Sequence, residues 1–351
     1  MRRMLELLLF TVLGTGPAPP PAPAAPAPVR HVFVIVLENK GFEQVFGNRP
    51  AAPYLARTLP AQGALIPRYY GIGHSSASNY IAMISGQPPT PASQADCGDP
   101  LRSVGSRAVA DGIAAGDGCV YPRRFRTLAD QLTGRGRTWR GYMEGIARNC
   151  SLASRSSADG RYRRKHNPFV FFRSLRDSGQ CAANDTSLSR LRTDLAQRGR
   201  TPNFSFIVPN QCNDAHDSCD ANDPDGMKRA DRFLRRWVPR ILSSPAFRAD
   251  GLLIVTFDES DGDASACCGE RPGPAARRPG ITGSGGGQTG AVLLSPFIAP
   301  GTVSATPYNH YSLLRSVEDL FGLPHLGYAR PAGLASFGAD VFTNTPTARS
   351  R

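Results

Sequence analysis

Residues 251–262 read Gly-Leu-Leu-Ile-Val-Thr-Phe-Asp-Glu-Ser-Asp-Gly, an apolar run that leads into the carboxylates Asp258, Glu259 and Asp261. An apolar run of this length, bounded by glycines, predicts a buried strand of a parallel sheet. Ligands of open α/β sheets bind just beyond the carboxyl ends of such strands. We therefore expect these three acids to lie where the protein binds its ligand.

Two further apolar runs, residues 31–37 and 203–208, are also followed by polar residues. These polar residues are Glu38, Asn39, Asp214, His216 and Asp217. If the strands converge, their side chains form a cage of carboxylates, an amide and a histidine, which suits a divalent cation. The identity of the cation stays open, because carboxylates and amides suit Mg, Ca or Mn, whereas histidine admits Zn or Fe. The pattern favours a metal-assisted hydrolase.

The order of the predicted elements favours an α/β protein. Strand-like runs alternate with helical segments, the strands at 31–37, 203–208, 252–257 and 291–294 and the clearest helices at 227–242 and 310–321. This alternation predicts a three-layer sandwich with a mostly parallel central sheet. Segments 86–125 and 262–290 are rich in glycine and are expected to be long loops.

The first residues have the features of an export signal. Two arginines precede the apolar stretch 5–13, which is too short to span a bilayer, and residues 17–28 are almost entirely Pro and Ala. We expect residues 1–28 to be a signal peptide and linker, residues 29–345 to be a single domain, and residues 346–351 to be a tail. The protein is thus predicted to be secreted or to lie in the cell envelope.

The eight cysteines agree with export, because an even number in a secreted chain indicates disulfides. Short loops favour three pairs: Cys97 with Cys119, Cys150 with Cys181, and Cys212 with Cys219. Cys267 and Cys268 are left over, and their adjacency would require a rare vicinal bridge. A zinc site is the alternative, although the chain contains no CxxC pair.

The net charge of +13 arises from 38 arginines and 3 lysines against 28 acidic residues, without a long basic run. A nucleic-acid-binding protein more often concentrates such residues together with aromatics, so we expect no nucleic-acid partner. The positive field of an exported protein would instead attract anionic small molecules or anionic membrane surfaces.

Residues 73–86 place several serines before an apolar stretch: Gly-His-Ser-Ser-Ala-Ser-Asn-Tyr-Ile-Ala-Met-Ile-Ser-Gly. On local grounds the serines suit a helix N-cap and Gly86 suits the helix end. The functional alternative is a serine nucleophile at the helix N-terminus, where free N–H groups and the helix dipole stabilise a phosphate.

Five motifs in this order resemble the phosphoesterase family of secreted acid phosphatases and bacterial phospholipases C, which belongs to the alkaline phosphatase superfamily. The motifs are Glu38-Asn39, Ser76 to Tyr80, Pro209 to Asp217, Thr256 to Glu259, and His310 to Ser312. Each motif alone is weak, but five in the expected order are strong, and they extend over nearly the whole chain after the linker. The resemblance implies an alkaline-phosphatase-like fold.

The resemblance also implies roles for single residues. Glu38, Asn39, Asp258 and Glu259 match metal-binding pairs, Ser76 matches the nucleophile, and Asn79 matches an amide that contacts the phosphate. His166 matches a histidine near the phosphate. Further metal or phosphate ligands are expected among Asp214, His216, Asp217 and His310. Serines at positions 75 and 78 leave the register of the nucleophile open by one or two residues.

This set of residues predicts a metal-dependent acid phosphatase that acts through a phosphoserine. Ser76 attacks in line, His166 or His216 protonates the leaving oxygen, and water then releases the phosphate. The expected substrates are phosphate monoesters on small molecules or phospholipid head groups, because five cationic residues gather in 161–173. A phospholipase C type phosphodiesterase is the alternative.

Two other functions fit parts of the sequence. A serine, Asp258 and His310 occur in the chain order of an α/β-hydrolase esterase triad, but the required Gly-x-Ser-x-Gly turn is absent. A non-catalytic exported protein that binds anionic ligands is the other candidate. Such a protein would need no buried acid cluster, so metal content separates it from the enzyme. Glu144, after a probable strand at 138–143, is expected to be structural.

Overall fold

The computed structural model describes residues 27–156 and 160–344. The predicted signal peptide and most of the linker, residues 1–26, lie outside the described residues, as does the predicted tail.

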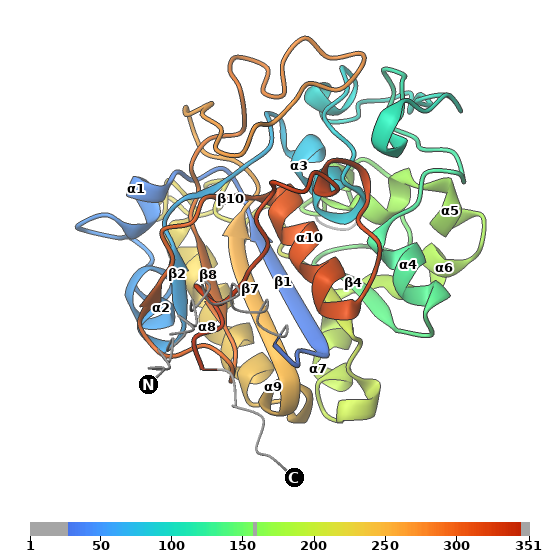
Figure 1. Cartoon of the computed structure of the whole chain (residues 1–351). Coiled ribbons are helices and arrows are strands. Elements are labelled where there is room, and N and C mark those ends of the chain that lie inside the picture. The colour runs from blue at the N-terminus through green and yellow to red at the C-terminus, as the bar shows by residue number, and fades with distance from the viewer. Residues whose placement is uncertain (1–26, 157–159, 345–351) are drawn as a thin grey trace, which may run out of the picture.

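A mixed sheet of eight strands forms the centre of the fold, in the order β5-β4-β6-β1-β7-β8-β2-β9 (Figure 1). A second sheet pairs β3 with β10. The strands are β1 His31–Leu37, β2 Ala64–Ile66, β3 Tyr69–Tyr70, β4 Trp139–Met143, β5 Asp185–Ser187, β6 Phe204–Val208, β7 Gly251–Phe257, β8 Ala291–Leu294, β9 Thr302–Val303 and β10 Tyr308–Asn309.

The prediction of a mostly parallel sheet is confirmed, with one exception in direction. The strand predicted at 291–294 is β8, and it runs antiparallel to both of its neighbours, β7 and β2. The remaining pairs of the large sheet are parallel. An apolar run predicts that a strand is buried on both faces but not which way it points.

Helices cover both faces of the sheet, which confirms the α/β class. Figure 1 shows α3 and α10 in front of the central strands. The α-helices are α1 Phe42–Phe46, α2 Leu59–Gln62, α3 Ser76–Ser85, α4 Leu128–Gly134, α5 Arg173–Arg176, α6 Gln180–Asn184, α7 Leu191–Asp194, α8 Met227–Leu242, α9 Pro245–Asp250 and α10 His310–Phe321. The two helices predicted at 227–242 and 310–321 are thus confirmed as α8 and α10.

The side chains of β1 divide between two hydrophobic cores, one on each face of the sheet. Val32, Val34 and Val36 pack into the core that contains residues of α3, α4 and α10. The alternate residues Phe33, Ile35 and Leu37 pack into the core that contains residues of α8 and α9. Since burying one such side chain contributes about 1.5–3 kcal/mol, β1 is a major source of stability at the centre of the molecule.

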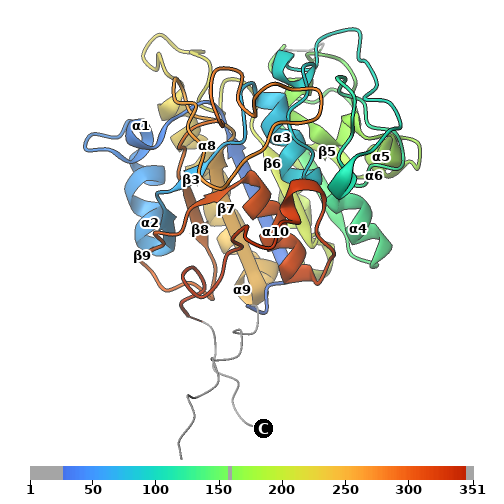
Figure 2. The same ribbon diagram turned by 45° about the horizontal axis from the view of Figure 1, so that its top comes forward.

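The register between β1 and β7 determines where the acidic residues lie. Leu37 is paired with Phe257 at the carboxyl ends of these parallel strands. The next residues along each chain, Glu38 and Asp258, therefore emerge side by side at the same edge of the sheet. Segments 86–125 and 262–290, which carry no α-helix or sheet strand, gather at the top of the molecule in Figure 2. The prediction that both are long loops is confirmed.

The three predicted disulfides, Cys97–Cys119, Cys150–Cys181 and Cys212–Cys219, are confirmed. Cys267 and Cys268 form a vicinal disulfide, which leaves these cysteines no thiolate for the alternative zinc site. Across the described ranges, no helix combines the length and the apolar character that crossing a membrane requires.

Candidate active site

Ser76 is the first residue of α3 and is almost fully buried. The preceding Ser75 is the N-cap, and the helix ends at Gly86, whose φ of 67° suits a residue without a Cβ. Ser75 makes no side-chain cap. Instead, Asp96, from a distant loop, accepts a hydrogen bond from Ala77 N to Oδ1 at 3.2 Å. The helix predicted from the serines and Gly86 is confirmed, but its cap comes from elsewhere in the chain.

The carboxylate of Glu38 holds Ser76 in place. Ser76 Oγ donates to Glu38 Oε2 at 2.9 Å, and Tyr80 OH donates to Oε1 at 2.6 Å. His166 Nε2 lies 3.1 Å from Glu38 Oε2, without hydrogen-bond alignment. Burial of Glu38 opposes ionisation, but His166 and Lys165 outweigh it and lower its pKa. Glu38 is therefore an ionised acceptor for the hydroxyl of Ser76.

A lysine also contacts Ser76. Lys165 Nζ donates to Ser76 Oγ at 3.3 Å and to Asp96 Oδ2 at 3.0 Å. Burial disfavours the charge of Lys165, but the negative charges of Glu38 and Asp96 raise its pKa to about 12. No sequence pattern singles out Lys165 within its cationic segment or Asp96 within its loop, yet both contact the residues around Ser76.

His166 lies between two of the predicted acidic residues. It ends the short 3₁₀ segment η4, Arg164–His166, and its buried ring stacks on Tyr80 with centroids 5.2 Å apart. Its Nδ1 is 3.9 Å from Asp214 Oδ2. The structure thus brings Ser76, Glu38, His166 and Asp214 together, as predicted from the sequence.

Asp258 and Asp214 each use one carboxylate oxygen for the backbone and leave the other without a donor. Asp258 Oδ1 accepts from Asn39 N at 3.1 Å and from Glu259 N at 2.7 Å. Asp214 Oδ1 accepts from His216 N at 2.9 Å. Within the described ranges, the buried Oδ2 atoms of both aspartates and Asn39 Oδ1 have no hydrogen-bond partner. Burial, together with the charge of Glu38, raises the pKa of both aspartates.

These residues fit a divalent cation by their chemistry. Buried oxygens without donors are costly, and a hard cation is a partner that would satisfy several of them at once. The predicted ligands are nevertheless not gathered as a compact coordination sphere. In the described part of the chain, ligand atoms of three His, Cys, Asp or Glu residues lie within 4.8 Å of one another only at Cys150–Cys181–Asp185 and Cys267–Cys268–Glu270, where the cysteines are disulfide-bonded.

Glu259 forms a buried ion pair with His74 Nδ1 at the entrance to α3. His74 Nε2 lies 2.9 Å from the carbonyl oxygen of Asp263. Burial opposes the charge of His74, but Glu259 outweighs it and raises the pKa of the histidine. A role of Glu259 as metal ligand stays a prediction. Asp261, the third acid after this strand, is exposed.

Asn79 and His310 are both occupied by backbone or tyrosine partners. Asn79 Oδ1 accepts from Ile72 N at 2.8 Å and from Gly73 N at 3.1 Å, and Nδ2 donates to Gly73 O at 2.8 Å. The amide therefore holds the turn that precedes Ser76. His310 Nδ1 lies 3.1 Å from Tyr69 OH and Nε2 lies 2.5 Å from Asp258 O. Burial lowers the pKa of His310 to about 4. Their contacts with phosphate or metal stay predictions.

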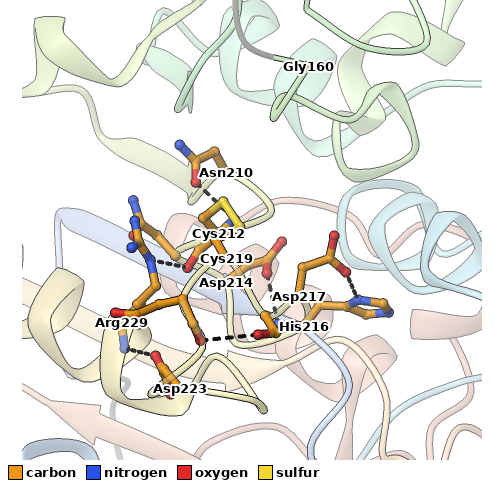
Figure 3. Close-up of a disulfide and its surroundings, with 12 residues drawn as sticks. Gly160, Asn210, Cys212, Asp214, His216, Asp217, Cys219, Asp223 and Arg229 are labelled. Atoms are coloured by element: carbon orange, nitrogen blue, oxygen red, sulfur yellow. Dashed lines mark hydrogen bonds and ion pairs between the residues drawn. A yellow bond between two sulfur atoms is a disulfide. The ribbon is translucent and has the colours of Figure 1, made fainter.

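The predicted ligands His216 and Asp217 pair with each other nearer the surface. His216 Nδ1 lies 2.6 Å from Asp217 Oδ1, and both side chains are more than a third exposed. Figure 3 shows this pair beside Asp214 and the Cys212–Cys219 disulfide that closes the loop. No contact of His216 with Ser76 or Glu38 occurs, so a catalytic role for His216 stays a prediction.

Glu144 supports the loop that carries Asp214. It accepts hydrogen bonds from Asn210 N at 2.9 Å and from Asn213 Nδ2 at 2.9 and 3.1 Å. These contacts fit the structural role that was expected for Glu144.

Comparison with known proteins identifies a family that this chain matches. Residues 51–324 match the Phosphoesterase family. The chain is 28% identical over 302 residues to an acid phosphatase of Aspergillus fumigatus, covering 84% of this chain and 55% of the fungal protein. It is 26% identical over 305 residues to a phosphatidylinositol-3-phosphatase of Mycobacterium tuberculosis, covering 86% of this chain and 80% of that protein. The chain thus spans little more than half of the fungal relative.

A solved structure supports the fold. A protein of the alkaline phosphatase superfamily from Vibrio parahaemolyticus superposes with a TM-score of 0.53 at 14% identity, covering 85% of this chain and 69% of that one. At this identity the likeness concerns the fold alone. The family match extends over most of the chain and includes Ser76, His166, Asp214 and Asp258. This chain belongs to the Phosphoesterase family.

Proposed function

We propose that this protein is an exported, acid phosphatase-like phosphoesterase that hydrolyses phosphate monoesters with Ser76 as nucleophile. The observation that carries the proposal is that Ser76 Oγ contacts both the Glu38 carboxylate, 2.9 Å away, and the Lys165 ammonium, 3.3 Å away. A hydroxyl at the start of a helix, with an acceptor for its proton and a cation beside its oxygen, is arranged to attack a phosphate.

Each residue of the site has a separate role in the proposed phosphoryl transfer. Glu38 orients the Ser76 hydroxyl and is the acceptor toward which its proton leaves. Lys165 and the N-terminus of α3 stabilise negative charge on the attacking oxygen and on the phosphoryl group. The bond from Ser76 Oγ to phosphorus forms as the bond to the leaving oxygen breaks, and water then releases phosphate from the serine.

His166 is the better candidate for the general acid. Its ring is buried at the site and lies within 3.1 Å of Glu38 and 3.9 Å of Asp214. His216 instead pairs with Asp217 where both are partly exposed. A histidine in this position can deliver a proton to the leaving oxygen, which is the role of the general acid in hydrolysis of a phosphate ester.

A divalent cation is part of the proposal. Asn39, Asp214 and Asp258 would hold it through the buried oxygens that have no donor among the described residues. When bound, such an ion would neutralise phosphate charge and lower the pKa of the attacking hydroxyl.

The net charge of the protein, its disulfides and the proteins similar to it support the proposed substrate class and the proposed export. The basic surface would attract phosphorylated small molecules or phospholipid head groups, and it would permit peripheral contact with anionic membranes. A relative named as a phosphatidylinositol-3-phosphatase supports monoesters on lipid head groups. Four disulfides support export to an oxidising compartment. Hydrolysis of diesters, as in a phospholipase C, is the alternative.

The geometry disfavours an esterase with a Ser-His-Asp triad. Such an enzyme needs a histidine that accepts the proton of the serine and an acid that binds the other ring nitrogen. His310 contacts Tyr69 and the main-chain oxygen of Asp258 rather than Ser76. A non-catalytic binding protein would not need a serine held between a carboxylate and a lysine.

The test is hydrolysis of nitrophenyl phosphate before and after exhaustive chelation, with metal analysis of the purified protein. We expect chelation to abolish turnover, re-addition of one divalent metal to restore it, and Asp258→Asn to lower kcat/KM by at least about a thousandfold. The matched control is Asp261→Asn, which changes an exposed acid of the same loop. Its kcat/KM should be close to that of wild type. Full activity after chelation would refute the metal-dependent mechanism.

A further inference from the structure

The five cations of segment 161–173 are not equivalent in the structure. Arg163 donates to Gly160 O, and Arg173 binds Asp177. Arg164 is committed to Asp99, at 2.9 Å, and to the carbonyl oxygens of Leu152 and Cys97. Lys165 contacts the proposed nucleophile, with Nζ 3.3 Å from Ser76 Oγ.

Asp96 links the lysine to the nucleophile helix. One oxygen of its carboxylate accepts from Lys165 Nζ at 3.0 Å, and the other accepts from Ala77 N at 3.2 Å. Asp96 has a φ of 54°, a conformation in which Asp and Asn are tolerated better than most residues. The neighbouring Cys97 is fixed by its disulfide to Cys119 and by a hydrogen bond from Arg164 Nη2 at 2.9 Å. Lys165 is thus held by an anchored loop.

We propose that Lys165 contacts the phosphoryl group of the bound substrate and determines a preference for dianionic monoesters, and that Asp96 is the positioning residue for Lys165. The proposal rests on the proposed function, since it names the residue that selects among phosphate esters at that same site.

The position of Lys165 allows its ammonium to reach the phosphoryl group of a bound substrate. A reacting phosphorus lies about 3–3.5 Å from the attacking oxygen, so its free oxygens come close to any group that already touches Ser76 Oγ. An ammonium has three donors, and the contacts with Ser76 and Asp96 use two of them. The side chain of Lys165 is 24% exposed. The third donor is available for a phosphate oxygen.

Charge supports the selectivity. A phosphate monoester carries up to two negative charges on its free oxygens, whereas a diester carries one. A fixed cation beside the attacked phosphorus therefore stabilises the monoester more than the diester. Loss of one positioned charge-stabilising donor typically costs about 100-fold to 1000-fold in rate. The loss should be smaller for a diester, which lacks the second charge.

The test compares Lys165→Gln, Lys165→Arg and Asp96→Asn with wild type on nitrophenyl phosphate and its bis-nitrophenyl diester. Lys165→Gln should lower kcat/KM for the monoester by about 100-fold and the ratio of monoester to diester activity by about tenfold. Lys165→Arg should restore part of that ratio. Lys228→Gln, which removes an exposed lysine of α8 by the same substitution, is the matched control and should leave the ratio unchanged.

Asp96→Asn isolates positioning from folding. Asparagine retains an oxygen for Ala77 N and tolerates the same φ, so the melting temperature should be close to wild type. We expect the monoester to diester ratio to fall with little change in stability. If Lys165→Gln lowers kcat/KM equally for the monoester and the diester, Lys165 does not determine the preference for monoesters. If Asp96→Asn leaves the monoester to diester ratio unchanged, Asp96 does not position Lys165.

Calorimetric titration with inorganic phosphate separates this inference from the proposed function. Wild type should bind phosphate at least about tenfold more tightly than Lys165→Gln, and Lys228→Gln should match wild type. Equal phosphate affinity in Lys165→Gln would overturn the contact even if the protein is an active phosphatase. Tighter binding by wild type in a protein without phosphatase activity would support the contact and refute the proposed function.

Discussion

Replacing Glu318 by glutamine is expected to stabilise the protein at neutral and alkaline pH. Glu318 lies on α10, is fully buried, and accepts a hydrogen bond from Leu326 N to Oε1 at 3.0 Å. Within the described residues, Oε2 makes no hydrogen bond of normal geometry, and the nearby Gln131 side chain lowers the pKa of Glu318 by less than burial raises it. Burial, with a smaller contribution from Asp319, raises the pKa of Glu318 from 4.5 to about 9. The folded protein therefore keeps a proton on this carboxyl at neutral pH.

The consequence for stability follows from proton binding. Between pH 4.5 and about 9 the folded state binds the proton of Glu318 and the unfolded state does not, so stability falls as pH rises through this window. Each pH unit costs about 1.4 kcal/mol, which amounts to about 3 kcal/mol at pH 7. Glutamine has no such proton to lose. The variant should equal wild type near pH 4 and exceed it by up to about 3 kcal/mol at pH 7.

The assay is urea unfolding at pH 4, 7 and 9, followed by tryptophan fluorescence with the disulfides intact. Glu43→Gln, an exposed glutamate of α1, is the control and should not change the pH dependence. A constant difference between Glu318→Gln and wild type at every pH would refute the reasoning, as would a variant that is less stable at pH 9.

Two further substitutions probe the surroundings of Ser76. Tyr80→Phe removes the 2.6 Å hydrogen bond from Tyr80 OH to Glu38. It should lower the free energy of unfolding by about 2 kcal/mol and should also lower kcat/KM. An unchanged kcat/KM would show that this hydrogen bond does not support Glu38 in catalysis. The double substitution Cys212→Ala and Cys219→Ala removes the disulfide that closes the loop beside Asp214. It should lower the free energy of unfolding by about 2 kcal/mol. It should also raise the metal concentration that gives half-maximal activity. A normal metal requirement would show that this loop does not position Asp214.

Much of the fold could be predicted because the apolar pattern of this chain is regular. The run 251–257 and the run 31–37 are buried on both faces, and parallel pairing alone brings Glu38 and Asp258 to one edge. The periodicity of 227–242 and the glycine after 310–321 were sufficient to give both helices. The direction of β8 was not predictable, since a short buried strand has the same composition in either orientation.

The site was only partly predictable, because part of it depends on which loops meet. Lys165 and Asp96 are 69 positions apart in the sequence. Their contact depends on the conformation of an anchored loop, which hydrophobic periodicity does not predict. Sequence could identify the acids after the strands, but not that Asn79 would bind the backbone of Ile72 and Gly73 or that His216 would pair with Asp217. Local hydrogen-bond partners compete for such side chains, and only the folded geometry decides between them.

The most direct test of the central claim is to trap the phosphoenzyme. Wild type is mixed with a phosphate monoester, quenched in acid, reduced and digested with trypsin, and the peptide of residues 69–102 is fragmented by mass spectrometry. We predict a phosphoryl group on Ser76 and none on the same peptide of Ser76→Ala, which should also lack turnover. A label on Ser75 or Ser78 would move the nucleophile by one or two positions. An unlabelled peptide together with an active Ser76→Ala variant would contradict the account.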